Sequence, residues 1–321
     1  MFRPGLNADE AIFSLLLTDD FEMRCQKCFQ CRFRGYTLIE TIVALGIFAI
    51  LISLASVGLQ AARETARQAQ CQNNLRQVGL AVQIFENRNG SFPTNGGYMR
   101  EVFRPLPGLL RHPLTVEFAA GHMYRWGVGH PLDSVRQQSG SWAYSLLPHL
   151  EQTACFEART TETSVLQYRC PSRGEREPSR PAPDRWGRYD GGTRIWAKTD
   201  YAANGRIIRN APDVARRSDL LTGSAHLICI GEKAHHPQIQ TPTSWLYDEP
   251  YFLGGSLGTR RSNANIRVDG TLADYQNGWG SAHRDRSHFV YFDGSVRGIN
   301  HSIDRLTFID RLNPSHPGNE P

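Results

Sequence analysis

The chain has 321 residues, a formal net charge of +5 and 40% hydrophobic residues. This charge is mild for the length, and no dense stripe of Lys and Arg interleaved with aromatic residues occurs, so we expect no nucleic-acid partner. The 29 glycines, 18 prolines and 10% aromatic residues indicate a loop-rich β protein beyond the N-terminal helix.

The first 35 residues have the composition of a leader. Residues 1–22 contain five acidic residues and a short apolar run, whereas four basic residues and no acid lie between Met23 and Gly35. Cytoplasmic flanks of membrane helices are enriched in Lys and Arg, so we predict a cytoplasmic leader over 1–35 and an extracytoplasmic large domain. Because the charge changes from acidic to basic at Met23, our hypothesis is that translation starts there. Residues 1–22 would then come from a mistaken start site.

An uncharged run of 22 residues, 41–62, begins directly after Glu40. As a helix it spans roughly 33 Å, which is enough for a hydrocarbon core of ~30 Å. We therefore predict a single transmembrane helix over 36–60. A carboxylate at the edge of such a run is costly, and it is usually kept because it has a partner.

The residues R-G-Y-T-L-I-E, from Arg34 to Glu40, resemble the processing signal of type IV prepilins and type II secretion pseudopilins. The resemblance implies cleavage after Gly35 by a prepilin peptidase and N-methylation of Tyr36, with the apolar helix retained in the inner membrane. It also implies assembly with other pilin or pseudopilin subunits, in which Glu40 pairs with the terminal amine of a neighbour. This fits the physics, because a carboxylate in a low-dielectric surround needs a counter-charge.

The helix is predicted to continue beyond the membrane over 61–90, because residues 61–69 are rich in strong helix formers. Asn89-Gly90 supplies a C-terminal stop. We expect the extension to pack under a sheet, since its apolar stripe is too short for a free coiled coil. The stripe consists of Cys71, Leu75, Val78, Val82 and Phe85.

A β-hairpin is predicted near the C-terminus. Residues 288–292 are aromatic and β-branched, Asp293-Gly294 is a tight-turn signal, and residues 295–299 return as the partner strand. His283 is expected to tether the preceding loop by a hydrogen bond rather than to act in catalysis. The predicted fold class is α+β, with the long N-terminal helix packed on an antiparallel sheet that carries large loop insertions, as in pilins.

Further segments resemble the planctomycete-type, pseudopilin-like DUF1559 family. The resemblance implies that residues 91–321 form a β-rich extracytoplasmic domain of this family, and that H-x9-D-G is its C-terminal signature. The matching segments are E-T-A-R-Q-A-Q-C-Q-N-N-L-R-Q-V-G-L-A-V from Glu64, W-A-Y-S-L-L-P-H-L-E-Q at 142–152, Y-R-C-P-S at 168–172, T-D-Y-A-A-N-G at 199–205, G-S-A-H-L-I-C-I-G-E-K at 223–233, and H-x9-D-G from His283 to Gly294.

Four cysteines, Cys71, Cys155, Cys170 and Cys229, lie in the part predicted to be outside the cytoplasm, where disulfides can persist. Four cysteines allow three pairings. Cys71 and Cys170 both occupy positions that resemble the family, so a bridge between them is favoured, which leaves Cys155 and Cys229 as the second pair.

No catalytic centre, cofactor or metal site is expected. The sequence contains no H-E-x-x-H, G-x-S-x-G or P-loop motif, and Cys25, Cys28 and Cys31 lack a fourth ligand nearby. Glu232 is expected to form an ion pair with a neighbouring arginine rather than to act as a general acid.

These features favour a membrane-anchored structural protein that assembles through its N-terminal helix. The alternative is a tethered extracytoplasmic binding protein for peptide or carbohydrate, with an aromatic-lined pocket in the loop-rich insertions 171–198 and 246–274. A surface hydrolase would need clustered carboxylates, which the sequence does not show.

Overall fold

The computed structural model describes residues 36–97, 114–117, 122–125, 127–174, 177–180, 187–190, 195–235, 250–255, 257–270 and 278–315. The predicted leader, including Gly35, and parts of both insertions lie outside the described residues. The chain divides into two compact units, Met1–Gln60 and Ala61–Pro321, and each is described by itself.

In the first unit, the described residues are the start of helix α3 (Leu38–Asn89) and the two residues before it. All residues from 36 to 60 are exposed. Within the described part of the chain, α3 is the one helix that is long and apolar enough to cross a membrane. Its first 23 residues would extend ~35 Å as a regular helix, which matches the thickness of a hydrocarbon core.

In the second unit, the later part of α3 buries the predicted apolar stripe. The helix ends at Asn89, and Gly90 takes up the left-handed conformation, with φ at +67°, that commonly follows a helix. The predicted end of the helix is therefore confirmed. The stripe is also confirmed, since all five of its residues are buried: Cys71, Leu75, Val78, Val82 and Phe85.

A five-stranded sheet forms the centre of this unit. Its strand order is β12-β11-β6-β5-β8, and all neighbouring strands are antiparallel except β5 and β8. The α+β class is confirmed, while one parallel pair at the edge makes the sheet mixed rather than wholly antiparallel. The strands are β5 (Tyr201–Asn204), β6 (Ile228–Glu232), β8 (Arg260–Arg261), β11 (Arg286–Tyr291) and β12 (Val296–Asn300).

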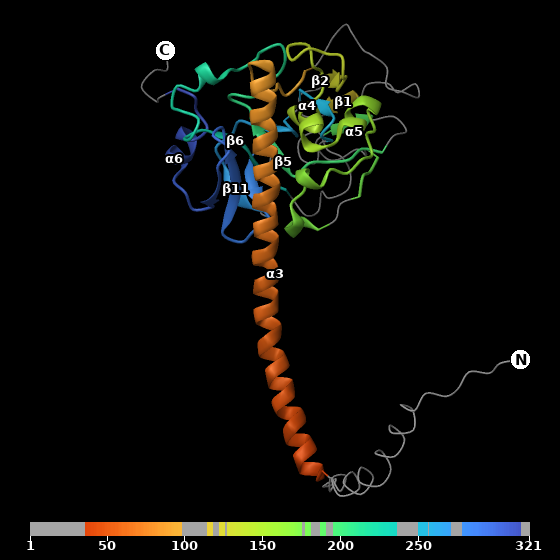
Figure 1. Cartoon of the computed structure of the whole chain (residues 1–321), viewed down its shortest axis with the longest axis vertical. Coiled ribbons are helices and arrows are strands. Elements are labelled where there is room, and N and C mark those ends of the chain that lie inside the picture. The colour runs from red at the N-terminus through yellow and green to blue at the C-terminus, as the bar shows by residue number, and fades with distance from the viewer. Residues whose placement is uncertain are drawn as a thin grey trace, which may run out of the picture. The chain divides into compact units, whose positions relative to one another are not determined.

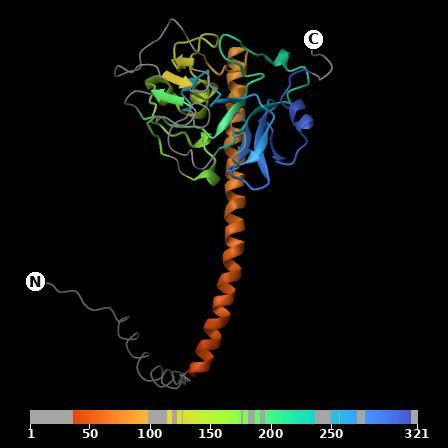
Figure 2. The ribbon, with the colours of Figure 1, turned by 180° about the vertical axis from the view of Figure 1, so that it is seen from behind.

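The two faces of the sheet bury different clusters, as the alternation of side chains along a strand requires. Val290 of β11 belongs to the cluster that contains the buried residues of α3. Phe289 and Tyr291 belong to the cluster on the opposite face, with Phe308 of helix α6 (Arg305–Asp310). Figures 1 and 2 show residues of α3 beyond 60 running alongside β5, β6 and β11.

Gly79 lets α3 approach the sheet closely. A Cβ atom at this position would lie 2.4 Å from Cγ2 of Val290, which is well inside van der Waals contact. The helix and the sheet are therefore in direct contact here, and this contact fixes which residues of α3 face β6 and β11.

Strands β11 and β12 form an antiparallel hairpin, and Asp293 and Gly294 lie in its turn. Oδ1 of Asp293 accepts hydrogen bonds from the backbone N–H and the hydroxyl of Ser295, and Gly294 adopts a φ of +84°. Both residues thus have roles that the turn itself requires.

Smaller elements surround the central sheet. Strands β1 (Leu114–Glu117), β2 (His122–Arg125) and β4 (Gly187–Asp190) form a three-stranded sheet, β3 (Gly127–Val128) pairs with β7 (Leu253–Gly254), and β9 (Ile266–Val268) pairs with β10 (Trp279–Ser281). The short helices are α4 (Trp142–Leu146), α5 (Thr153–Ala158), η1 (Leu147–Leu150), η2 (Leu166–Tyr168), η3 (Pro171–Arg173) and η4 (Arg217–Asp219).

Candidate functional site

The first candidate site is the start of α3, where Thr37 and Glu40 form a capping box. The backbone N–H and the hydroxyl of Thr37 donate to Oε2 of Glu40 at 2.9 and 3.0 Å, and the N–H of Glu40 donates to the hydroxyl of Thr37 at 3.4 Å. These bonds satisfy N–H groups that have no partner inside the helix. Glu40 therefore has a local structural role besides the assembly role predicted for it, and Tyr36, which directly precedes the box, is exposed.

The helix that follows is apolar on every side. Because its large side chains are exposed all around the axis, the segment has no polar face to turn toward water. Such a surface is stable only against lipid or against other apolar surfaces. The exposed side chains are Leu38, Ile39, Ile42, Val43, Leu45, Ile47, Phe48, Ile50, Leu51, Ile52, Leu54, Val57 and Leu59.

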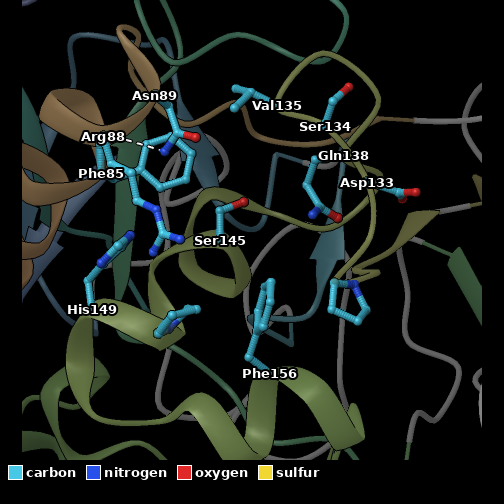
Figure 3. Close-up of a pocket in the computed structure, with 12 residues that line it drawn as sticks. Phe85, Arg88, Asn89, Asp133, Ser134, Val135, Gln138, Ser145, His149 and Phe156 are labelled. Carbon is cyan, nitrogen blue, oxygen red and sulfur yellow. Dashed lines mark hydrogen bonds between the residues drawn. The ribbon is translucent and has the colours of Figure 1, made fainter.

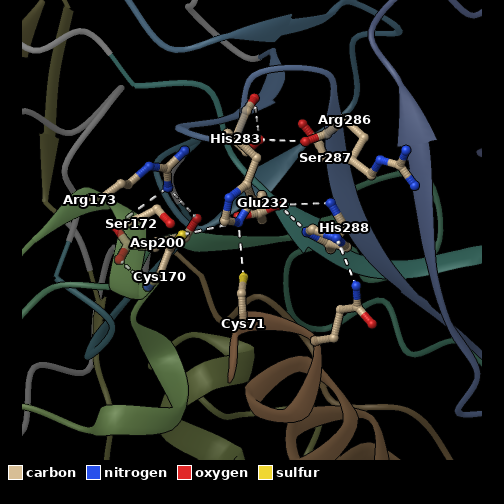
Figure 4. A network of polar contacts seen from close by, with 12 residues as sticks. Cys71, Cys170, Ser172, Arg173, Asp200, Glu232, His283, Arg286, Ser287 and His288 are labelled. Atoms are coloured by element: carbon tan, nitrogen blue, oxygen red, sulfur yellow. Dashed lines mark hydrogen bonds and ion pairs between the residues drawn. The ribbon is translucent and has the colours of Figure 1, made fainter. Parts of the chain in front are cut away.

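The second candidate site is a buried polar cluster between α3 and the central sheet (Figure 4). Cys71 comes from the buried stripe of α3, Glu232 ends β6, His283 lies between β10 and β11, and His288 lies on β11. All four residues are fully buried, and their ligand-type atoms lie within 4.8 Å of one another. We refer to these four residues as the Cys-Glu-His cluster.

Glu232 lies at the centre of the Cys-Glu-His cluster. Its Oε1 is 3.3 Å from Sγ of Cys71 and 3.5 Å from Nε2 of His283. Its Oε2 accepts the backbone N–H of His288 at 2.7 Å and lies 3.2 Å from Nδ1 of the same residue. Burial raises the pKa of Glu232, but the hydrogen bond from His288 and the nearby charges of both histidines outweigh burial and leave the pKa below its usual value.

Outer hydrogen bonds orient both histidine rings. Nδ1 of His283 lies 2.8 Å from Oε1 of Glu64, whose two carboxylate oxygens also accept the hydroxyl of Ser172 at 3.0 Å. Nε2 of His288 lies 3.1 Å from the side-chain amide of Gln72. Each ring thus has one nitrogen toward the centre of the cluster and one toward an outer partner.

Cys170, Glu232 and Glu64 together favour the charged form of His283. Burial lowers the pKa of His283, but the hydrogen bond with Cys170 and the charges of Glu232 and Cys170, together with the bond to Glu64, raise the pKa to about 9. Burial likewise raises the pKa of Glu64, while hydrogen bonds from His283 and Ser172 bring it below the usual value.

A second buried group borders the cluster. Arg173 donates to both carboxylate oxygens of Asp269, at 2.7 and 3.1 Å, and its Nη1 lies 3.5 Å from Oδ1 of Asp200. Oδ2 of Asp200 in turn accepts the backbone N–H of Cys170 at 2.6 Å. Arg173 also donates to the backbone carbonyls of residues 200, 233 and 280, so it joins segments that are distant in the sequence.

The structure corrects the predicted disulfides, because all four cysteines of the described residues are free. Cys71 and Cys170 do lie together and hydrogen-bond through their sulfur atoms, which raises the pKa of Cys71 and lowers that of Cys170. Cys155 instead lies beside the carbonyl of Thr160 and the hydroxyl of Tyr251. Neither predicted bridge is formed: the thiols of Cys71 and Cys170 share a hydrogen bond, and Cys155 contacts Thr160 and Tyr251 instead.

The predicted arginine partner of Glu232 is also wrong. The side chain pairs with two histidines and a thiol, and Arg173 acts on it only through its charge. A carboxylate at the end of an otherwise apolar strand was the available signal. The identity of its partners depended on how α3 and β11 meet β6, which no local pattern encodes.

A pocket of about 260 Å³ lies at the C-terminal end of α3 (Figure 3). Phe85 of α3 and Phe156 of α5 contribute aromatic side chains, and His149 lies beside Phe85 at 5.9 Å between ring centroids. The volume is below the ~300–1,000 Å³ typical of small-molecule sites. The pocket lies outside both loop-rich insertions, so the predicted aromatic pocket within them stays a prediction.

Comparison with known proteins gives two matches. Residues 60–306 match the family described as "Protein of unknown function (DUF1559)", and residues 31–56 match the prokaryotic N-terminal methylation motif. No curated protein and no solved structure matches the chain. The methylation motif indicates prepilin-type processing by a prepilin peptidase, and the apolar helix that follows it indicates single-pass membrane anchoring.

Proposed function

The chain belongs to the DUF1559 family, and we propose that it is a pilin- or pseudopilin-like structural subunit, not an enzyme, that assembles through its N-terminal helix. In this proposal, prepilin peptidase cleaves after Gly35 on the cytoplasmic side, and Tyr36 becomes the methylated N-terminal residue. The apolar part of α3 stays in the inner membrane and Ala61–Pro321 lies outside the cytoplasm.

The observation that carries the proposal is the exposed apolar surface of α3 directly after the methylation motif. From 36 to 60 no residue is buried, and the surface is apolar on all sides. A bare anchor needs only this surface and requires no charge at its edge. The presence of Glu40 at its edge supports a partner, because an ionisable group facing lipid is costly.

The two roles of Glu40, in capping and in assembly, make different demands on its side chain. The capping box uses the hydrogen-bonding capacity of Oε2, which an uncharged glutamine also has. Pairing with the cationic amine of a neighbouring subunit requires the negative charge. Glutamine at this position therefore keeps the cap and removes the charge, whereas alanine removes both.

The test compares Glu40→Gln, Glu40→Ala and Thr37→Val in cells that contain prepilin peptidase. Membrane insertion, cleavage and the amount of crosslinked or sedimenting oligomer are measured for each variant. We expect Glu40→Gln and Glu40→Ala to insert normally and to lose oligomers alike, while Thr37→Val, which removes the capping hydroxyl but keeps the charge, retains most of them.

If Glu40→Gln assembles as well as the unchanged chain and only Glu40→Ala fails, Glu40 serves the helix cap and the assembly proposal loses its main support. Intact-mass analysis of the membrane form is an independent check. It should give a chain that begins at Tyr36 with one added methyl group, and a chain that keeps its leader would contradict the proposed processing.

A further inference from the structure

We propose that the Cys-Glu-His cluster is a structural Zn²⁺ site in which Cys71, Glu232, His283 and His288 each supply one ligand atom. The site ties the later part of α3 to β6 and β11 and to the loop before β11. It is independent of the N-terminal assembly proposal, since none of its ligands lies before residue 61.

The ligand chemistry fits zinc. Thiolate sulfur, imidazole nitrogen and carboxylate oxygen are the three donor types that Zn²⁺ uses in proteins, and closed sites with four protein ligands are structural. All four side chains here are fully buried, so the arrangement matches a closed site. One thiolate and one carboxylate together neutralise the charge of one Zn²⁺, which limits the cost of burying charge.

The distances are also those of a coordination sphere. With bonds of ~2.0–2.3 Å, the edges of a tetrahedron around Zn²⁺ are about 3.3–3.7 Å. The cluster already has Oε1 of Glu232 at 3.3 Å from Sγ of Cys71 and at 3.5 Å from Nε2 of His283. Since all four ligand atoms lie within 4.8 Å of one another, the longest separation exceeds a tetrahedral edge by only ~1 Å.

The outer shell matches what metal-bound histidines require. A ligating histidine almost always donates its other ring N–H to a carboxylate, a backbone carbonyl or water, which fixes the tautomer and the ring orientation. His283 presents Nε2 inward and Nδ1 to Glu64 at 2.8 Å. His288 presents Nδ1 inward and Nε2 to the amide of Gln72 at 3.1 Å, and rotation of that amide places its oxygen toward the ring.

Binding replaces protons with the metal ion. Zn²⁺ takes the place of the thiol proton of Cys71 and of the proton on Nε2 of His283, and both protons pass to solvent. The proton of His288 moves from Nδ1, which binds the metal, to Nε2, which donates to the rotated amide oxygen of Gln72. Glu232 exchanges its hydrogen bonds with Cys71 and His283 for a bond to the metal, while Oε2 keeps the backbone N–H of His288 at 2.7 Å. Cys170 remains outside the ligand set, next to Cys71 and His283.

The test uses the full chain purified in detergent and measures Zn²⁺ by elemental analysis and by competition with a chromophoric chelator. Co²⁺ serves as a spectroscopic substitute, because a thiolate ligand gives a charge-transfer band in the near ultraviolet. We expect one ion per chain and a thiolate band with Co²⁺, and we expect Cys71→Ser to lose the band and to bind Zn²⁺ at least ~100-fold more weakly.

Two variants guard against loss of folding. Glu64→Gln changes a carboxylate that is 36% exposed and orients His283 without being a ligand, so the chain should fold and bind Zn²⁺ about 10–100-fold more weakly. Cys229→Ser changes a buried cysteine of β6 that is not one of the four ligands, and it should leave both the affinity and the Co²⁺ spectrum unchanged.

Three results would overturn the proposal. The first is a folded chain that binds no stoichiometric Zn²⁺. The second is a Co²⁺ complex that lacks the thiolate band or keeps it in Cys71→Ser. The third is a disulfide between Cys71 and Cys170 in the chain isolated without reductant, because that bond would consume the thiolate.

Discussion

Replacing Gly79 by alanine tests the contact between α3 and the central sheet. The new Cβ would lie 2.4 Å from Cγ2 of Val290, which is fully buried and cannot move away without disturbing its neighbours. Overpacking of this kind costs about 1–3 kcal/mol. The exchange of Gly for Ala inside a helix favours folding by about 1 kcal/mol, so the net loss should be roughly 0–2 kcal/mol.

A double-mutant cycle with Val290→Ala isolates the steric part of this effect. Val290→Ala alone removes buried methyl groups and should cost roughly 1–3 kcal/mol. In the double variant the new methyl group at position 79 occupies the space that the valine leaves. We therefore expect the double variant to lose less stability than the sum of the losses in the two single variants, with a coupling energy of about 1–2 kcal/mol.

The assay is thermal unfolding of the full chain in detergent, followed by tryptophan fluorescence. For a unit of this size, 1 kcal/mol corresponds to a shift in Tm of about 2–4 °C. Asn73→Ala, at an exposed position of the same helix, is the control that changes helix propensity alone. If Gly79→Ala raises Tm as this control does, and shows no coupling to Val290→Ala, the close approach of helix and sheet is refuted.

Four further substitutions, one of them a control, test the second unit with the same assay. Arg173→Met leaves the largely buried carboxylate of Asp269 without its arginine and should cost about 3–5 kcal/mol. Arg297→Met, which removes an exposed pair, should change stability by less than ~1 kcal/mol; equal effects would contradict the buried network. Gly294→Ala places a side chain at a φ of +84° and should cost about 1–2 kcal/mol, so an unchanged Tm would contradict the turn geometry. Ser141→Ala removes the side chain that caps α4 by accepting two backbone N–H groups, and it should lower stability by about 0.5–2 kcal/mol. A change in stability outside this range would contradict the capping role.

Local patterns were sufficient to predict the secondary structure around the sites. The helix stop at Asn89-Gly90 and the buried stripe that includes Leu75 and Val78 follow from chain stereochemistry and from the period of the helix. The turn at Asp293-Gly294 likewise depends only on adjacent residues. Each of these features is encoded within one short segment, which is why the sequence predicts it.

The Cys-Glu-His cluster could not be predicted in this way. Its members at 71, 232, 283 and 288 come from separate segments and show no ligand spacing except the short interval between the two histidines. They converge because Cys71 faces the sheet from α3, while Glu232 of β6 and His288 of β11 lie on the face of the sheet that α3 covers. Cys71 lies beside Cys170 without the predicted disulfide, and the choice between a disulfide and a shared polar centre depends on the other groups that meet there.

The boundary at Ala61 has a practical consequence for producing the second unit in water. A chain that starts at Ala61 omits the exposed apolar segment, and it retains Glu64, Cys71 and all the buried residues of α3. A chain that starts after Cys71 would look equally reasonable from hydropathy, yet it would leave Glu232 and both histidines without their thiol neighbour. The chain that starts at Ala61 should therefore be soluble and crystallisable, whereas the chain that starts after Cys71 should aggregate.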